Sequence, residues 1–348
     1  EFNLENELRD VFDNNEYESS DNKSAGNIKN MRFIDAIHSG LEQALMEHNN
    51  LILMGQDIAD YGGVFKATDT FLEQFGKDRV MNTPLCESAI VGTGVGLSVM
   101  GMKTMIEMQF SDFVSEAMTQ ICNQAAKLYY RWGQNVDMVI RMPTGAGVNA
   151  GPFHSQSTES WFTRIPGLKV VYPSNAYDAK GLLLQAFEDP NPILFFEHKA
   201  LYRSQDSDVP EGYYTIPFGK ANLLEEGKEI TIVSYGLGIR WVNEWMLKNP
   251  EVSVDLIDLR TFVPLDSDTI IDSVKKTGRC VIVQEDTFRG SIGNDISQII
   301  QSKCFNYLDA PVKVAASIDT PIPFAAELEK GYLANRWMDD ILRNTLNY

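Results

Sequence analysis

The feature that most constrains the fold is an alternation of short apolar runs with longer amphipathic stretches. Leu51 to Met54 is an apolar run that ends at Gly55, and before it Phe33, Ile37 and Leu41 recur at helical spacing. A run that is apolar at every position is typical of a strand buried on both faces of a parallel sheet. The sequence therefore predicts an open α/β fold, with a parallel sheet that helices cover on both faces.

The alternation continues along the chain in two blocks. In the first block, further strands are expected over 103–108, 137–142, 168–171 and 193–197, and helices over 33–45, 88–100, 112–131 and 176–188. The second block predicts strands over 229–233, 253–258 and 280–285 and helices over 239–248 and 268–274. A stretch with Pro210 and Gly212 separates the blocks, so we expect an α/β domain over 31–209 and a smaller α/β domain over 210–348.

Residues 1–30 differ from the rest of the chain. They are rich in Glu, Asp, Asn and Ser and nearly free of large apolar residues after Phe12. Such a segment buries too little apolar surface to order itself, and it predicts an acidic flexible linker or leader. A short amphipathic helix from Leu4 to Phe12 is the alternative.

Composition limits the kinds of partner and the compartment. The net charge is −18, and no cluster of Lys and Arg is present, which argues against nucleic acid binding. No apolar run approaches the ~18 residues of a membrane-spanning helix, so no membrane association is expected. The four cysteines have no paired spacing, and we expect free, buried thiols in a reducing compartment and no zinc site. The bacterial cytoplasm or the mitochondrial matrix of a eukaryote fits this.

The stretch Asn82-Thr83-Pro84-Leu85-Cys86-Glu87 places a single carboxylate between a proline-containing turn and a helix of small residues. With apolar neighbours, Glu87 loses part of its hydration. Enzymes use a glutamate in such a place to exchange a proton with a ring nitrogen. The simpler alternative is an acidic residue at a helix start, where it complements the helix dipole.

Gly92, Gly94 and Gly96 follow directly and invite comparison with a dinucleotide-binding motif. That motif needs the order strand, glycines, helix, whereas these glycines lie inside a predicted helix. We therefore expect them to allow close packing between helices.

Two further segments are candidates for a site. His154 lies in a loop of glycine, proline and hydroxyl residues after a predicted strand, and loops at strand ends are where α/β proteins keep their sites. Gln109 and Phe113 occupy the preceding strand-to-helix turn, where an amide and an aromatic ring can grip a flat heteroaromatic ligand. A helix cap and a core aromatic are the equal alternative. His198, after another strand, is expected to orient a loop.

Five motifs occur in one order along the chain: Pro84-Leu85-Cys86-Glu87, Glu107-Met108-Gln109-Phe110, Phe153-His154-Ser155-Gln156, Pro166-Gly167-Leu168-Lys169-Val170-Val171 and Asp258-Leu259-Arg260-Thr261. Together they resemble the beta subunit of the thiamine-diphosphate-dependent 2-oxo acid dehydrogenases, from about residue 31 to Tyr348. The resemblance implies a transketolase-like pyrimidine-binding domain and a transketolase C-terminal domain. It also implies oxidative decarboxylation of a 2-oxo acid, with acyl transfer to a lipoyl domain.

The resemblance assigns roles to the candidate residues. In the family, the glutamate matching Glu87 hydrogen-bonds the aminopyrimidine ring of the cofactor and promotes its imino tautomer. Leu85, Gln109 and Phe113 match positions at the pyrimidine half of the cofactor. The position of Phe113 is often tyrosine, so a hydroxyl contact would be missing here. His154 matches a histidine implicated in acyl transfer to the lipoyl group.

The resemblance also implies a structural potassium ion held by backbone carbonyls. The matching positions are Val136, Met138, Val139, Ala186, Asp189 and Asn191.

Half of the cofactor site is expected to lie on another polypeptide. The superfamily holds the diphosphate and magnesium with a Gly-Asp-Gly motif, and this sequence contains none. The resemblance therefore implies activity only with an alpha partner, in a heterotetramer of two alpha and two beta chains. A dihydrolipoyl acyltransferase would be the second component, whose basic subunit-binding domain could dock on the acidic C-terminal domain.

The substrate and the surroundings of the chain are less constrained. Glu107–Phe110 and Leu194–Lys199 favour branched-chain 2-oxo acids, with pyruvate or acetoin enzymes as the alternative. The family usually has an acid at the position of Gln56, and the consequence of this departure is open. The acidic start is also typical of the connector in a fused alpha–beta chain. Two other classes, a transketolase-like enzyme and a non-catalytic interaction module, fit the motifs less well.

Overall fold

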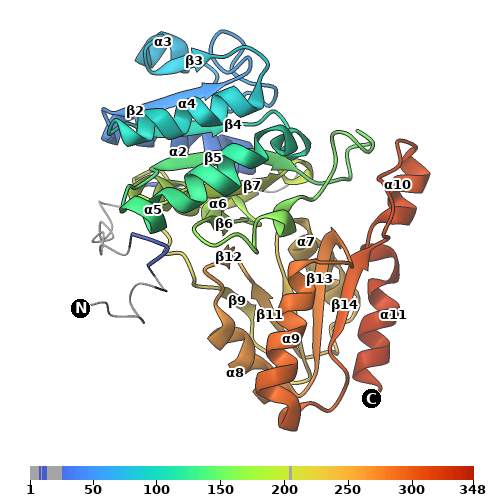
Figure 1. Ribbon diagram of the computed structural model, residues 1–348. Coiled ribbons are helices and arrows are strands. Elements are labelled where there is room, and N and C mark those ends of the chain that lie inside the picture. The colour runs from blue at the N-terminus through green and yellow to red at the C-terminus, as the bar shows by residue number, and fades with distance from the viewer. Residues whose placement is uncertain (1–7, 9, 14–25, 204–205) are drawn as a thin grey trace.

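A computed structural model describes residues 8, 10–13, 26–203 and 206–348 of this chain (Figure 1). The larger of its sheets has seven strands in the order β12-β6-β7-β5-β4-β2-β3. Its strands are β2 (Leu51–Gly55), β3 (Val80–Asn82), β4 (Lys103–Glu107), β5 (Met138–Thr144), β6 (Lys169–Val171), β7 (Ile193–His198) and β12 (Thr261–Val263). All neighbouring pairs are parallel except β12 with β6. The parallel strands therefore end at one common edge.

Helices cover both faces of this sheet, as the sequence predicts. Figure 1 shows α4 (Glu87–Val99) and α5 (Ala126–Trp132) on one face and α2 (Phe33–Glu47) and α6 (Ala176–Glu188) on the other. Alternate strand residues divide between the two layers: Leu53 packs in the cluster with α2 and α6, and Ile52 in the cluster with α4. Each strand is thus buried on both sides, which explains its continuous apolar character.

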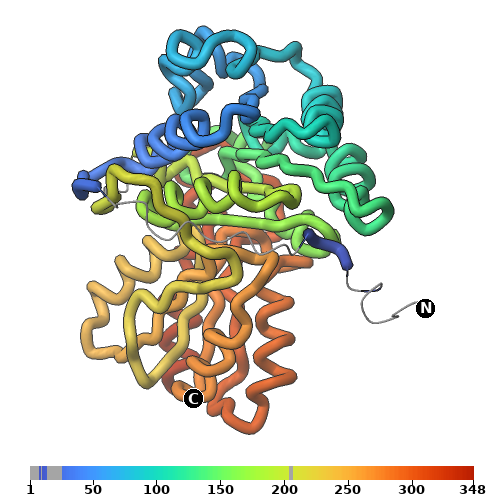
Figure 2. The backbone as a smooth tube through the Cα atoms, turned by 90° about the vertical axis from the view of Figure 1, so that its left-hand side faces the viewer, coloured from blue at the N-terminus to red at the C-terminus, as the bar shows by residue number. Residues whose placement is uncertain are grey.

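The C-terminal part of the chain forms a five-stranded sheet in the order β14-β13-β10-β11-β9. Its strands are β9 (Asn222–Glu225), β10 (Ile230–Ser234), β11 (Val254–Asp258), β13 (Cys280–Thr287) and β14 (Lys313–Ser317). Its helices are α7 (Leu237–Lys248), α8 (Ser267–Thr277), α9 (Ile292–Cys304), α10 (Ala326–Tyr332) and α11 (Asn335–Leu346). Figure 2 shows this body below the larger sheet, with the segment after residue 210 (yellow) running from one to the other.

The start of the chain differs from the expected linker. Residues 28–30 belong to β1 (Ile28–Arg32), which pairs antiparallel with β8 (Asp206–Pro210). Most side chains of β1 are exposed, so backbone hydrogen bonds rather than apolar burial hold it, and composition could not reveal it. The expected domain boundary near residue 210 stays a prediction.

A second described piece of the start is also anchored. The backbone N–H of Asp13 donates to Asn191 Oδ1 at 2.9 Å, and Asn135 Nδ2 donates to Asp13 Oδ2 at 2.6 Å. The possible helix over 4–12 and the rest of the linker lie largely outside the described residues.

The single long helix expected over 112–131 is wrong. The structure has a 3-10 helix (η1, Ser111–Ala117), a π-helix (η2, Gln120–Ala125) and the short α5. Gly167 approaches so closely that a Cβ there would lie 1.9 Å from the carbonyl oxygen of Ala126. The chain at Gly167 thus packs directly on the point where the π-helix passes into α5, a tertiary contact that local sequence does not show.

The expectation of free, buried thiols holds in part. All four cysteines are free, and Cys280 and Cys304 are buried, but Cys86 is exposed. In the described residues, no helix is both long and apolar enough to cross a membrane.

The three glycines of α4 face three different environments. A Cβ at Gly94 would lie 2.6 Å from Ile106 Cδ1 and 3.0 Å from Met138 Sδ, so this glycine packs on the sheet rather than on a helix. Gly92 faces Gln120 of η2, and nothing lies within 4 Å of a Cβ at Gly96. Helix packing therefore explains Gly92 alone.

We expect opposite effects from alanine at two of these positions. Gly94→Ala should lower the free energy of unfolding by about 1–3 kcal/mol because the core has no room for the methyl group. Gly96→Ala should raise it by about 0.5–1 kcal/mol because alanine favours the helix and the site is open. Urea unfolding of both variants measures this, and an equal change in both would contradict the packing argument.

Candidate active site

Glu87 lies at the carboxyl edge of the larger sheet, where it opens α4 just after β3. Its side chain is 8% exposed. Gln56, which follows the end of β2, donates from Nε2 to Glu87 Oε1 at 3.1 Å. The amide of Gln56 therefore holds one oxygen of the carboxylate. Among the described residues, no side chain forms a hydrogen bond with Glu87 Oε2.

Two other predicted residues lie at the same edge of the sheet. Leu85 stands on the turn before α4 and is 80% exposed. Gln109 is half-buried beyond the end of β4, and its Nε2 makes a long contact of 3.5 Å with Asp57 Oδ2. Asp57 has a left-handed φ of 58° in the loop after β2. These groups gather at the ends of adjacent parallel strands.

His154 lies in an aromatic cluster next to this group. Its ring meets Phe110 edge to face, with ring centroids 4.9 Å apart, and meets Phe113 in the same way at 5.5 Å. Edge-to-face contacts of this kind fix the plane of a ring without using its nitrogens. The imidazole of His154 is therefore oriented by packing.

The structure thus brings the predicted residues to one edge in two groups. One contains Glu87 with Gln56, and the other contains His154 with Phe113. Gln109 and Phe110 join the groups along the chain. Among the described residues, no hydrogen bond or ring contact connects Glu87 directly to His154.

Beneath the edge lies a fully buried cluster of charges. Arg141 Nε lies 2.6 Å from Glu197 Oε1, and Arg141 Nη1 lies 2.7 Å from Glu107 Oε2. Tyr202 donates from its hydroxyl to Glu197 Oε2 at 2.7 Å. Burial raises the pKa of Glu107, although Arg141 opposes this. The guanidinium ties β4, β5 and β7 together below the site.

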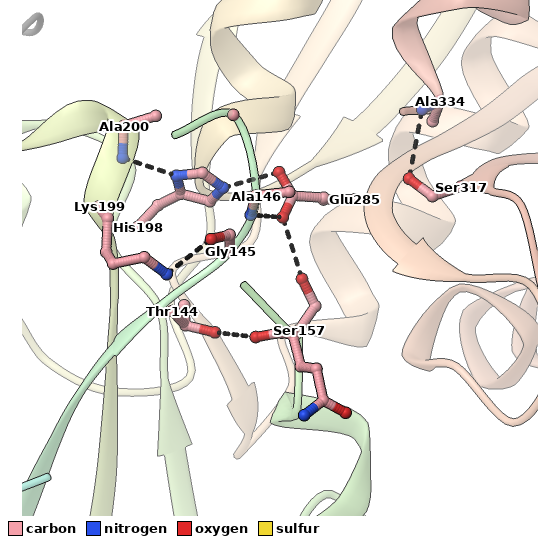
Figure 3. Close-up of polar contacts among 12 residues, drawn as sticks. Thr144, Gly145, Ala146, Ser157, His198, Lys199, Ala200, Glu285, Ser317 and Ala334 are labelled. Carbon is pink, nitrogen blue, oxygen red and sulfur yellow. Dashed lines mark hydrogen bonds and ion pairs between the residues drawn. The ribbon is translucent and has the colours of Figure 1, made fainter. Parts of the chain in front are cut away.

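A second polar cluster joins the two halves of the chain (Figure 3). His198 Nε2 lies 2.7 Å from Glu285 Oε2, and the N–H of Ala146 donates to Glu285 Oε1 at 2.6 Å. Lys199 donates from Nζ to the carbonyl of Gly145 at 2.6 Å. His198 Nδ1 also accepts the N–H of Ala200 at 3.2 Å, so this histidine does order the chain around it.

Burial and charge act differently on two members of this cluster. Burial lowers the pKa of Lys199 to about 8, against the attraction of Asp112, Glu285 and Glu329. Burial alone would raise the pKa of Glu285, but His198 and the amide of Ala146 bring it below its ordinary value. The surroundings thus stabilise the charged form of Glu285 and destabilise the charged form of Lys199.

Comparison with known proteins assigns a family. The family model "Transketolase, pyrimidine binding domain" matches residues 29–205, and "Transketolase, C-terminal domain" matches residues 219–337. The chain is 44% identical over 310 residues to the 2-oxoisovalerate dehydrogenase subunit beta of Bacillus subtilis, which covers 88% of this chain and 95% of that protein. The chain belongs to the family of 2-oxo acid dehydrogenase beta subunits.

Other similar proteins are also beta subunits of 2-oxo acid dehydrogenases. A 2-oxoisovalerate dehydrogenase subunit beta 2 of Arabidopsis thaliana is 42% identical over 92% of this chain and 90% of its own. A pyruvate dehydrogenase E1 component subunit beta of Rickettsia felis is 39% identical over 85% of this chain and 92% of its own. A solved split-gene transketolase, described as an inactive beta4 tetramer, has a TM-score of 0.72 at 22% identity, over 91% of this chain and 98% of that one. The predicted family and fold class are confirmed.

The positions proposed for potassium in this beta-subunit chain lie in two neighbouring segments. One segment leads into β5, and the other runs from the end of α6 to the start of β7. The positions are Val136, Met138, Val139, Ala186, Asp189 and Asn191. Asn191 Nδ2 donates to Asp189 Oδ1 at 2.8 Å and to the carbonyl of Asp13 at 3.0 Å. Val139 pairs with Ile193 in the sheet. The segments adjoin, and ligation of potassium stays a prediction.

Sequence reasoning missed several residues around the site of this family member. Asp57 and Lys199 each follow a strand of the parallel sheet, a position that could have marked them. Glu285 and Glu329 reach the site from the C-terminal sheet and from α10. Their contacts span more than a hundred residues of sequence, and no local pattern signals them.

The free energy of unfolding should depend on pH through Lys199. The folded protein should release the Lys199 proton near pH 8, whereas the unfolded chain holds it up to the ordinary pKa of 10.5. In this window the unfolded state binds more protons, so the contribution of Lys199 to stability rises with pH. The free energy of unfolding relative to Lys199→Met, measured in urea at pH 7.5, 8.5 and 9.5, should increase. A constant difference would contradict the assignment.

Proposed function

We propose that this chain supplies the pyrimidine-binding half of a thiamine-diphosphate-dependent 2-oxo acid dehydrogenase, with branched-chain substrates favoured. The observation that carries the proposal is the pair of Gln56 and Glu87. A shielded carboxylate with one oxygen fixed by an amide is suited to exchange a proton between its other oxygen and a ring nitrogen. Its place at the common edge of a parallel sheet is where α/β proteins bind ligands.

The surrounding residues fit a flat heteroaromatic ring. The exposed Leu85 offers an apolar face, and the amide of Gln109 can donate or accept a hydrogen bond. Phe113 offers only its ring, so this position contributes stacking without a hydroxyl contact. When bound, thiamine diphosphate supplies the nucleophilic carbon and the electron sink for decarboxylation. The role of Glu87 is to hold and move the proton that this chemistry needs.

We assign His154 to the transfer of the acyl group to the lipoyl domain. Its ring is half-buried against Phe110 and Phe113, and packing rather than hydrogen bonding fixes its plane. The ring nitrogens are therefore available to pass a proton to or from the lipoyl sulfur during transfer.

Branched-chain substrates are favoured by a cavity of about 640 Å³ beside Phe110. Val64, Phe65, Val148 and Ala150 make most of its lining apolar, and Lys199 and Arg203 are its charged members. Aliphatic side chains gain from such a lining, while the methyl group of pyruvate leaves most of it unused. The Bacillus and Arabidopsis relatives are named for 2-oxoisovalerate, which supports the same choice, and the Rickettsia relative is named for pyruvate, which supports pyruvate as the second candidate.

An alpha partner would complete the site and hold the magnesium and the diphosphate, in a tetramer of two alpha and two beta chains. Two large apolar side chains stand exposed near the candidate site: Leu85 at 80% and Phe153 at 67%. Exposed apolar groups gathered in this way are typical of a protein interface. The relatives are themselves named as subunits. A structural potassium ion and docking of the acyltransferase on the C-terminal domain complete the proposal.

Cofactor binding should depend on the partner. We expect calorimetric titration of thiamine diphosphate and magnesium to give no measurable binding to this chain alone. Binding and decarboxylation of 2-oxoisovalerate should both appear when the alpha partner is added. Tight binding to the isolated chain would overturn the half-site, and faster turnover of pyruvate would overturn the branched-chain assignment.

Glu87→Gln should remove decarboxylation from the assembled enzyme. The amide keeps the size of the side chain but cannot take up the proton, and loss of a positioned general acid–base group costs about 10²–10⁴-fold in rate. The melting temperature should change little. Glu73→Gln, an exposed position on α3 (Phe71–Phe75), is the matched control and should keep full activity. Near-normal turnover by Glu87→Gln would rule out the proton-exchange role.

A further inference from the structure

The loop that carries His154 is held from both halves of the chain. It leaves β5 after Thr144 and returns at Gln156. Within the half of the chain that forms the larger sheet, Thr144 Oγ1 donates to the carbonyl of Gln156 at 2.9 Å, and the N–H of Gln156 donates to Asp112 Oδ1 at 3.1 Å. These bonds close the base of the loop. Its other contacts with the larger-sheet half include Lys199 Nζ on the carbonyl of Gly145 and the rings of Phe110 and Phe113 against His154.

The middle of the loop is held by Glu329 of α10. The N–H of Gly147 donates to Glu329 Oε1 at 3.1 Å, and the N–H of Asn149 donates to Oε2 at 3.1 Å. Glu329 is 3% exposed. Asn149 has a left-handed φ of 58°, a conformation that asparagine adopts more readily than most other residues. Figure 1 shows the green loop after β5 reaching toward α10.

Further contacts from the C-terminal half follow along the same loop. Glu285 accepts the N–H of Ala146 and the hydroxyl of Ser157, the latter at 3.2 Å (Figure 3). The ring of Phe324, just before α10, lies so close to Gly151 that a Cβ there would come within 2.3 Å of it. The loop is therefore in contact with the C-terminal half at several points before and after His154.

Backbone amides are the described hydrogen-bond partners of the Glu329 carboxylate. A carboxylate held in this way depends on the path of the backbone and not on the identity of the side chains. Amides that converge on one anion lose their partner together if the loop moves, which makes the arrangement selective for one loop conformation.

We propose that Glu329 is a positioning residue for His154, so that the C-terminal half of the chain sets the place of the imidazole during acyl transfer. The inference rests on the proposed role of His154. Loss of the carboxylate frees Gly147 and Asn149, and a displacement of about 1 Å at a reacting group costs on the order of 10²-fold in rate.

The test compares Glu329→Ala with Glu327→Ala in the assembled alpha–beta enzyme. Glu327 lies on the same helix, is exposed and pairs only with Lys330 among the described contacts, so its variant should behave as wild type. Two rates are measured: decarboxylation with an artificial electron acceptor, and acylation of an isolated lipoyl domain. Because Val148 and Ala150 of the same loop line the cavity proposed for the substrate, decarboxylation should fall in Glu329→Ala as well. Acylation should fall at least about tenfold more.

A double-mutant cycle with His154→Ala separates positioning from general damage. If Glu329 acts through His154, adding Glu329→Ala to His154→Ala should cause no further loss of acylation. Hydrogen exchange at the amides of Gly147 and Asn149 should accelerate in Glu329→Ala and not in Glu327→Ala. Glu329→Gln, which retains one acceptor oxygen, should recover part of the acylation rate.

The outcomes distinguish two failures. Impaired acylation in His154→Ala together with normal acylation in Glu329→Ala would overturn the positioning role and leave the proposed function intact. Normal acylation in His154→Ala would overturn the role of His154, and the positioning role with it. Losses that add fully in the double variant would show that Glu329 acts by another route.

Discussion

The site depends on a single buried guanidinium. Arg141 in β5 bonds Glu107 of β4 on one side and Glu197 of β7 on the other, and all three side chains are almost fully buried. A buried charge that loses its partner costs about 3–5 kcal/mol, so these strands cannot shift in register without a large penalty. The register fixes where each strand ends. It therefore fixes where the loops that bear Gln109 and His154 begin.

The fold could be predicted from the sequence where burial leaves a pattern in side chains. Runs such as Leu51–Gly55 are apolar throughout because helices cover both of their faces. His154 could be singled out because loops after strands collect functional groups in this class of fold, and Glu87 because a single carboxylate follows a proline-containing turn and opens a helix of small residues. The pairing of β1 with β8 left no such pattern, since backbone groups make it. The π-helical stretch before Ala126 left no such pattern either, and the segment that packs on it at Gly167 lies far along the chain.

Some of the many acidic residues are buried and form hydrogen bonds inside the protein. At the junction of the two halves, Glu285, Asp286 and Glu329 are all buried. Their hydrogen-bond partners include backbone amides, the hydroxyl of Ser160 at 2.7 Å and the imidazole of His198, but no lysine or arginine among the described contacts. The net charge counted from the sequence does not distinguish these buried carboxylates from carboxylates exposed to solvent. Their partners became visible only in the folded chain, which is why sequence reasoning missed half of the surroundings of His154.

One strand joins the C-terminal half to the larger sheet by backbone pairing. β12 belongs by sequence to the C-terminal half, yet it completes the larger sheet by pairing Thr261 with Val171 of β6. A fragment ending near residue 210 would leave β6 paired with β7 alone, with its other edge open. An open sheet edge of this kind recruits strands from other molecules and promotes aggregation. The larger sheet is therefore finished only after synthesis has passed residue 263, so completion of this edge must wait for most of the chain.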